Sequence, residues 1–139
     1  MPLIEWRRES RRIRLPIVIL QAHPLTEVHG LTATALLDTG ATLSGVAYRI
    51  AAALGLPGRG KIPISSVHGV RQVERFEFRV GLTPDYSPPS TPRFPFVLDQ
   101  VIGLGLSDAF EFDALLGMDV LGQCDFAMNR RGACRLVFG

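Results

Sequence analysis

The chain has 139 residues, of which 47% are hydrophobic and 20% are charged, so it is long and apolar enough to bury one core. This composition excludes a disordered tail. The formal net charge is only +2, yet five arginines crowd the N-terminus: Arg7, Arg8, Arg11, Arg12 and Arg14. We therefore expect residues 1–12 to form a loosely held basic arm before a single domain over residues 13–139.

A basic arm of this kind can bind nucleic acid, because arginines neutralise phosphates. Glu5 and Glu9 interrupt the basic run, and the sequence has no RNA-binding aromatic signature or zinc spacing. These features argue against nucleic acid as a partner. A nucleic-acid-associated module is kept only as a third alternative.

The two cysteines, Cys124 and Cys134, are not in a CxxC motif, and no histidine pair lies at ligand spacing. We expect free thiols and no metal site. The N-terminus has no apolar signal segment, and the apolar run at residues 15–20 is too short to cross a bilayer. The expectation is a cytoplasmic protein.

In chain order, residues 13–20 are rich in β-branched side chains and predict a strand. Residues 21–30 carry proline and glycine and predict a turn, and residues 31–37 predict the second strand of a hairpin. Apolar residues at helical spacing predict a short helix within residues 43–56, with Gly55 as its stop.

Residues 61–82 alternate between apolar and polar, which predicts a long hairpin whose turn lies near His68 and Gly69. Such a hairpin can arch over a cleft as a flap. Residues 83–96 contain five prolines, which exclude a helix or a central strand, so they are expected to be a loop insertion within the domain.

The C-terminal part predicts five more elements, four strands and one short helix. Residues 96–106 read as an apolar strand, and residues 112–121 as a strand that enters a glycine and then a short helix. Residues 124–128 and 133–138 predict two strands around a turn at residues 129–132.

One carboxylate closes an apolar strand, because Asp38 directly follows Leu36 and Leu37 and precedes Thr39 and Gly40. A carboxylate in such a place is costly unless it is paired or used. The Thr39 hydroxyl can donate and accept a hydrogen bond, and Gly40 admits a ligand or another backbone because it has no Cβ. Asp38 is therefore predicted to be a catalytic acid.

Three other acids are expected to have structural or surface roles. Asp119 lies in the first turn of the predicted short helix, where a negative charge is favourable. Asp113 and Asp125 are expected to cap backbone groups or face solvent.

Three features follow one another in a specific order: Asp38-Thr39-Gly40-Ala41, a hairpin with Gly69 at its tip, and Leu115-Leu116-Gly117 before a short helix. This ordered set resembles the retropepsin-like aspartic proteases, and most of all their bacterial and cellular single-domain members. The resemblance covers roughly residues 13–138. It implies a mostly β fold, namely a single closed β-barrel lobe with a flap hairpin and one or two short helices.

The resemblance also implies an aspartic endopeptidase in which two carboxylates share a proton and activate a water between them. The chain has a single Asp-Thr/Ser-Gly triplet and is too short for two lobes. The second Asp38 must then come from a second copy of the chain, so a homodimer is expected. An extended peptide would be the substrate, and no cofactor is needed.

The resemblance assigns roles to single residues as well. Thr39 would hold the partner subunit across the two-fold axis, and Gly40 would offer its carbonyl to the substrate backbone. The substrate-binding positions would be Ala41, Thr42, Val67, His68, Gly69 and Leu115.

Two departures from the retroviral pattern motivate an alternative. Thr42 and Leu43 stand where retroviral enzymes carry acids that hold the substrate backbone, and Met118 stands where they carry the arginine paired with those acids. The alternative is a catalytically silent dimer of the same fold that acts as a peptide-binding or assembly module.

Overall fold

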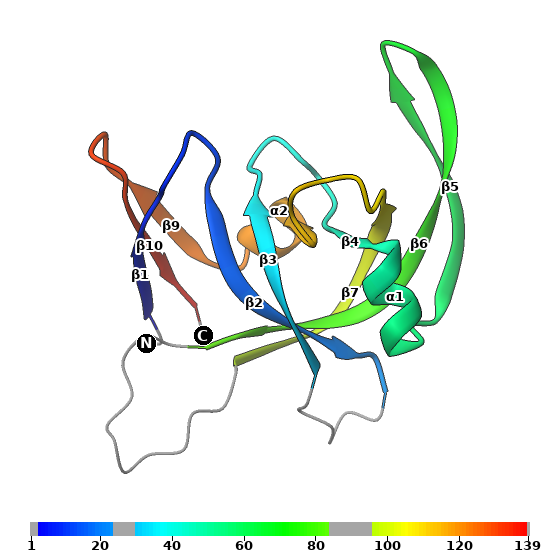
Figure 1. Cartoon of the computed structure of the whole chain (residues 1–139), viewed down its shortest axis with the longest axis horizontal. Helices are drawn as coiled ribbons and strands as arrows, with labels where there is room; N and C mark the ends of the chain where they lie inside the picture. The colour runs from blue at the N-terminus through cyan, green and yellow to red at the C-terminus, as the bar shows by residue number, and fades with distance from the viewer. Residues whose placement is uncertain (1–2, 24–29, 84–95, 139) are drawn as a thin grey trace.

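The computed structural model describes residues 3–23, 30–83 and 96–138, which form mostly strands (Figure 1). In chain order the elements are β1 (Leu3–Arg7), β2 (Arg14–Gln21), β3 (Gly30–Leu37), β4 (Gly45–Ala47), α1 (Tyr48–Leu54), β5 (Gly58–Ser66), β6 (Gly69–Leu82), β7 (Phe96–Leu106), β8 (Ala114–Leu116), α2 (Met118–Leu121), β9 (Asp125–Met128) and β10 (Ala133–Val137). The predicted fold class, mostly β with a hairpin and two short helices, is confirmed.

Among the described residues, seven strands make one sheet in the order β2-β3-β8-β4-β7-β6-β5, and β2 also pairs with β6. This extra pairing brings the sheet round on itself into a barrel-like ring. The ring is not a strictly closed barrel, because β5 continues beyond it as half of a hairpin.

The core lies inside this ring, because alternate residues of each strand point inward. Along β3, Ala33, Ala35 and Leu37 are buried, whereas Thr34 and Leu36 face the other side and are only partly buried. Side chains from β2, β6 and β8 complete the same cluster. The inward face of β3 therefore anchors the strand, and its outward face leads toward Asp38.

The first strand was not foreseen. Leu3–Arg7 form β1, which pairs antiparallel with β10 in a three-stranded sheet ordered β1-β10-β9. The interpretation of the N-terminus as a loosely held arm is wrong for these residues. Ile4 is buried and Trp6 packs on Phe126 with 6.3 Å between ring centroids, so period-two burial outweighs the exposed charges of Glu5 and Arg7.

The helix predicted within residues 43–56 begins later, at Tyr48, because Gly45–Ala47 form β4 between β7 and β8. A Cβ on Gly45 would lie 2.8 Å from the Leu106 side chain, so this close strand contact needs glycine. The helix ends as predicted at Gly55, whose φ of 60° is left-handed. The proline-rich insertion lies outside the described residues, except for its two ends.

The strands β5 and β6 form the predicted hairpin, with Val67 and His68 at its turn, and Figure 1 shows it projecting from the body of the molecule. An ion pair between a buried glutamate and an exposed arginine holds its base. The Arg59 guanidinium on β5 donates to the Glu77 carboxylate on β6, and Gln100 Nε2 donates to the other carboxylate oxygen at 3.0 Å. The hydrogen bond from Arg59 outweighs burial and holds the pKa of Glu77 below its ordinary value.

Glu77→Gln is expected to destabilise the protein near neutral pH and to matter less in acid. Because the folded-state pKa of Glu77 lies below the unfolded value of about 4.5, its stabilisation is complete above that value and is lost as pH falls through the folded pKa. Urea unfolding at about pH 7 and about pH 3 checks this. The exposed Glu74→Gln is the matched control, and an equal gap at both pH values would contradict the assignment.

Candidate active site

The Asp38 loop begins where β3 ends against β8. The two strands run parallel, with Leu36 opposite Leu115 and Leu37 opposite Leu116. The Asp38 N–H donates to the Leu116 carbonyl at 3.0 Å, so the strand pairing continues to the acid itself. Asp38 therefore has a fixed position at the end of β3 rather than on a free loop.

The turn after Asp38 orients its carboxylate. The Gly40 N–H donates to Asp38 Oδ1 at 2.9 Å, and the Ala41 N–H donates to the Asp38 carbonyl at 3.2 Å. A Cβ on Gly40 would lie 3.2 Å from Oδ1, which is tighter than ordinary contact. A partly buried carboxylate thus accepts a backbone hydrogen bond, while Thr39 and Gly40 remain exposed.

The short helix α2 supports the loop from behind. Its first N–H groups have no acceptors within the helix, and the loop supplies them: Met118 donates to the Ala41 carbonyl at 2.8 Å and Asp119 to the Thr42 carbonyl at 3.2 Å. A Cβ on Gly117 would lie 2.8 Å from the Ala41 carbonyl oxygen. The predicted strand, glycine and helix therefore serve to grip the loop that carries Asp38.

Ser44 and Asp119 form a second support that sequence reasoning missed. Ser44 is fully buried; its hydroxyl donates to Asp119 Oδ1 at 2.6 Å and its N–H donates to Asp119 Oδ2 at 3.0 Å. The Gly117 N–H donates to the same hydroxyl at 3.0 Å. Asp119 does lie in the first turn of α2, as expected, but its larger role is to tie α2 to the Asp38 loop. In the sequence, Ser44 stands out as a small polar residue directly before the apolar strand β4.

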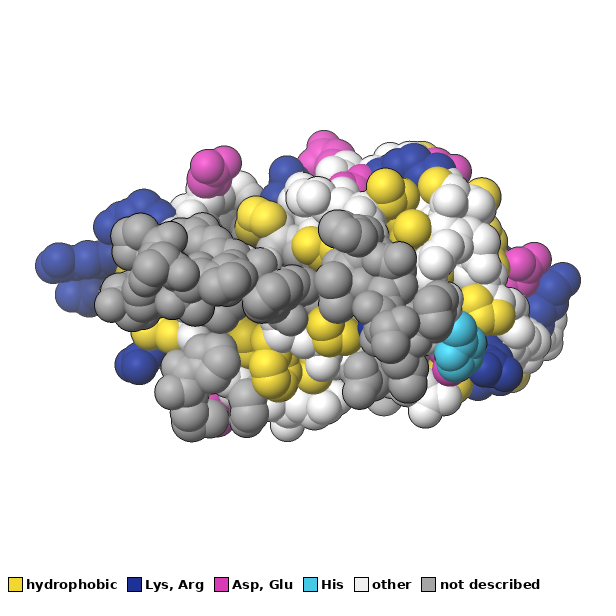
Figure 2. Space-filling model, turned by 90° about the horizontal axis from the view of Figure 1, so that it is seen from below, with side chains coloured by type: hydrophobic (Ala, Val, Ile, Leu, Met, Phe, Trp, Pro, Cys, Tyr) yellow, Lys and Arg dark blue, Asp and Glu magenta, His cyan; other side chains and the backbone are white. Residues whose placement is uncertain are grey.

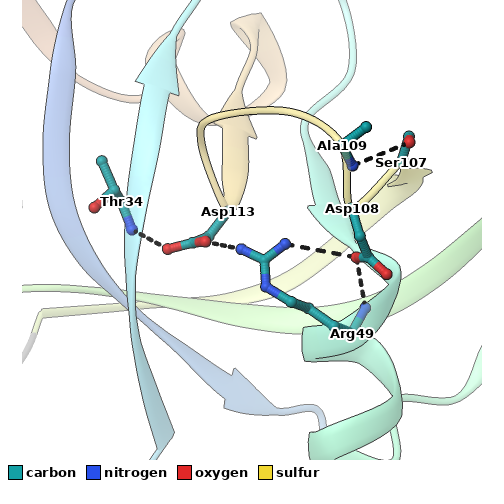
Figure 3. A network of polar contacts seen from close by, with 6 residues as sticks. All are labelled: Thr34, Arg49, Ser107, Asp108, Ala109 and Asp113. Carbon is teal, nitrogen blue, oxygen red and sulfur yellow. Dashed lines mark hydrogen bonds and ion pairs between the residues drawn. The ribbon is translucent and has the colours of Figure 1, made fainter.

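Asp113 is also structural, as Figure 3 shows. Its carboxylate accepts the Thr34 N–H at 2.9 Å and forms an ion pair with Arg49. The Arg49 N–H donates to Asp108 at 3.0 Å, so this network connects β3, the segment before β8 and the start of α1. The expectation that Asp113 caps backbone groups is confirmed, and Asp125 is exposed as expected.

The predicted site residues fall into two groups. Asp38, Thr39, Gly40, Ala41, Thr42 and Leu115 come together at the end of β3 and β8. The other group is Val67, His68 and Gly69 at the hairpin turn, where Val67 is 97% exposed. The His68 N–H donates to Ser66 Oγ at 3.2 Å, within the hairpin itself. The functional roles of both groups stay predictions.

No group of three or more His, Cys, Asp or Glu side chains is arranged to hold a metal ion within the described residues. Cys124 and Cys134 are unpaired. Within the same part of the chain, every helix is too short or too polar to cross a membrane.

Ser44→Ala is expected to lower the free energy of unfolding by about 1–3 kcal/mol, because it leaves the partly buried Asp119 carboxylate and the buried Gly117 N–H each short of a partner. Chemical denaturation checks this against Ser65→Ala, which removes an exposed hydroxyl from β5. Equal stability of the two variants would show that the buried network does not support the loop.

The chain is similar to known aspartic proteases in one family model and in solved structures. A family model described as aspartyl protease matches residues 26–83, less than half of the chain, a stretch that holds Asp38 and the hairpin. No curated protein sequence matches the chain.

Among solved structures, the chain resembles a retropepsin-like aspartic protease from Rickettsia conorii, with a TM-score of 0.61, 16% identity, and coverage of 98% of this chain and 92% of that one. It also aligns with the EIAV protease in complex with the inhibitor HBY-793, with a TM-score of 0.49, 16% identity, and coverage of 82% of this chain and 88% of that one. The similarity to the Rickettsia conorii structure confirms the resemblance at the level of architecture: the chain has a retropepsin-like fold.

Proposed function

We propose that the protein is a homodimeric aspartic endopeptidase. The observation that carries the proposal is the Asp38 carboxylate, which a rigid, doubly supported loop presents at the edge of the sheet. The family model that matches this stretch and the retropepsin-like fold support peptide hydrolysis as the reaction.

In the proposed reaction, the Asp38 carboxylates of two subunits share one proton, because two close carboxylates cannot both ionise. The ionised carboxylate takes a proton from a water held between them, and the water oxygen attacks the peptide carbonyl. The protonated carboxyl donates to the carbonyl oxygen, and the leaving nitrogen is protonated as the tetrahedral intermediate collapses. This chemistry needs no metal and no cofactor.

The surroundings of Asp38 support a dimer. Thr39 and Gly40 are exposed, and the Thr39 hydroxyl has no hydrogen-bond partner among the described residues, so it is available to the backbone of the partner subunit. The Gly40 carbonyl, Ala41 and Thr42 would line the substrate cleft beside Leu115. The hairpin tip at Val67–Gly69 would close over an extended peptide through main-chain hydrogen bonds.

Asp38→Asn is expected to lower kcat by about 100-fold to 10,000-fold or more, because the amide cannot serve as the acid or base. A peptide-library cleavage assay across acidic pH, with sedimentation to measure the dimer, checks this. The exposed Asp125→Asn is the matched control.

Undiminished cleavage by the Asp38→Asn variant would refute the proposal. Binding of an extended peptide without cleavage by the wild type, over a wide pH range, would favour the silent peptide-binding or assembly module instead. Block of turnover by a peptide that carries a statine group would exclude that module.

Gly69→Ala is expected to raise KM several-fold and leave kcat nearly unchanged, because Gly69 has a φ of 105° that an alanine adopts only with strain. The strain would disturb the tip that contacts substrate. Gly58→Ala is the control, since Gly58 has open space around it and no left-handed φ. Equal KM values for the two variants would remove the hairpin tip from the substrate-binding surface.

A further inference from the structure

The segment that joins β1 to β2 lies directly beside Asp38. The Leu37 N–H donates to the Ile13 carbonyl at 2.8 Å, so the segment ends next to the residue before the acid. Figure 1 shows this segment and the loop after β3 at the same edge of the molecule. The end of the segment at Ile13, and Arg14 directly after it, therefore lie beside the last residues of β3.

The pairing of β2 with β3 places side chains of both strands on the same outward face. Arg14 pairs with Leu36 and Pro16 pairs with Thr34, and paired residues in an antiparallel sheet point to the same side. The side chains at these positions lie on the face opposite the buried Ala35. One surface thus runs along β2 and β3 and ends at Asp38.

A cavity of about 570 Å³ opens on this surface. Its lining includes Trp6, four arginines and a single acid: Arg7, Arg8, Arg12, Arg14 and Glu9. Figure 2 views the molecule from below, the side away from the β1–β2 segment, and shows that basic side chains also gather at the end where β1, β9 and β10 lie in Figure 1. The volume falls within the range of pockets that bind small ligands or side chains.

Three hydrogen-bond donors in the cavity lining lack acceptors. Trp6 Nε1, Arg8 Nε and Arg14 Nε are shielded from solvent and have no hydrogen-bond partner among the described residues. All three groups can only donate. A shielded donor without an acceptor costs about 1–3 kcal/mol, so a side-chain shift that pairs it with an acceptor oxygen of a ligand in the cavity is favoured.

Existing contacts hold the arginines but leave these donors unused. Arg14 Nη2 donates to Glu111 at 2.9 Å, and Arg8 Nη1 donates to the Ser10 carbonyl at 3.1 Å. Counting Glu111 with Glu9, four guanidinium groups face two carboxylates. The cavity therefore keeps a positive excess.

We propose that this cavity is a substrate subsite that binds an acidic side chain, glutamate in particular, of the peptide whose cleavage Asp38 catalyses. A carboxylate supplies acceptors for the Nε and indole donors, and the apolar stem of glutamate fits against Trp6 and Pro16. The inference rests on the proposed function. Thr34 lines the cavity, and the extended chain from Thr34 to Asp38 spans about 13 Å at 3.3 Å per residue. That span places the acidic residue roughly three to five positions from the cleaved bond.

The test compares peptides that differ only by glutamate or glutamine at each position around the cleaved bond. Wild type is expected to cleave the glutamate peptide about 10-fold faster in kcat/KM at one of these positions. Arg14→Gln and Arg8→Gln should each bring the ratio close to one, because they lower kcat/KM for the glutamate peptide. Arg11→Gln removes a charge from the same segment outside this cavity and should keep the wild-type ratio.

A binding measurement separates this inference from the proposed function. Trp6 is the only tryptophan of the chain, so its emission reports on the cavity. A labelled glutamate peptide should bind the Asp38→Asn protein, as measured by the anisotropy of the label. The same binding should change the emission of Trp6. The glutamine peptide should change it much less, and Arg14→Gln should abolish the difference.

Cleavage without a glutamate preference, or a preference that survives both Arg8→Gln and Arg14→Gln, would overturn the subsite and leave the protease intact. If wild type cleaves no peptide, the protease fails, and the Trp6 titration alone decides whether an acidic-peptide site exists. A response to glutarate or inorganic phosphate as strong as the response to the peptide would make the cavity a free-anion site and refute the peptide proposal.

Discussion

The parallel pairing of β3 with β8 is the contact on which the candidate site depends. It joins segments far apart in the chain and ends in the hydrogen bond from the Asp38 N–H to the Leu116 carbonyl. Because each strand buries alternate residues in the core, the pairing cannot slip by one residue without exposing that face. The position of Asp38 is therefore set by the hydrophobic core rather than by the loop.

The groups behind the loop convert this position into a rigid geometry. The α2 helix uses its unsatisfied N–H groups on loop carbonyls, and Asp119 accepts from the backbone and hydroxyl of Ser44. A fully satisfied buried polar network favours one arrangement, because any alternative leaves a donor or acceptor unpaired. Such rigidity suits a site in which two carboxylates must meet at a fixed distance.

The β5–β6 hairpin and the arginine-rich segment between β1 and β2 are held to the sheet by different contacts. The hairpin is anchored at its base by the Arg59–Glu77 pair, while its tip is exposed. The arginine segment is tied to β3 through Ile13 and presents donors that lack acceptors. In the proposed protease, the hairpin would hold peptide backbone, and the cavity would select a side chain.

The sequence by itself determined most of the strands, the long hairpin, the two short helices and the carboxylate that follows β3, because period-two burial and glycine positions are local signals. It missed β4, which falls within the segment predicted to be helical. It did not reveal β1, since charged residues masked the buried alternation of Ile4 and Trp6. Only the tertiary structure decided that Ser44 meets Asp119, and that arginines near the N-terminus line a cavity together with Thr34 of β3. Those contacts join residues distant in sequence, and a distant partner leaves no periodic trace in the chain.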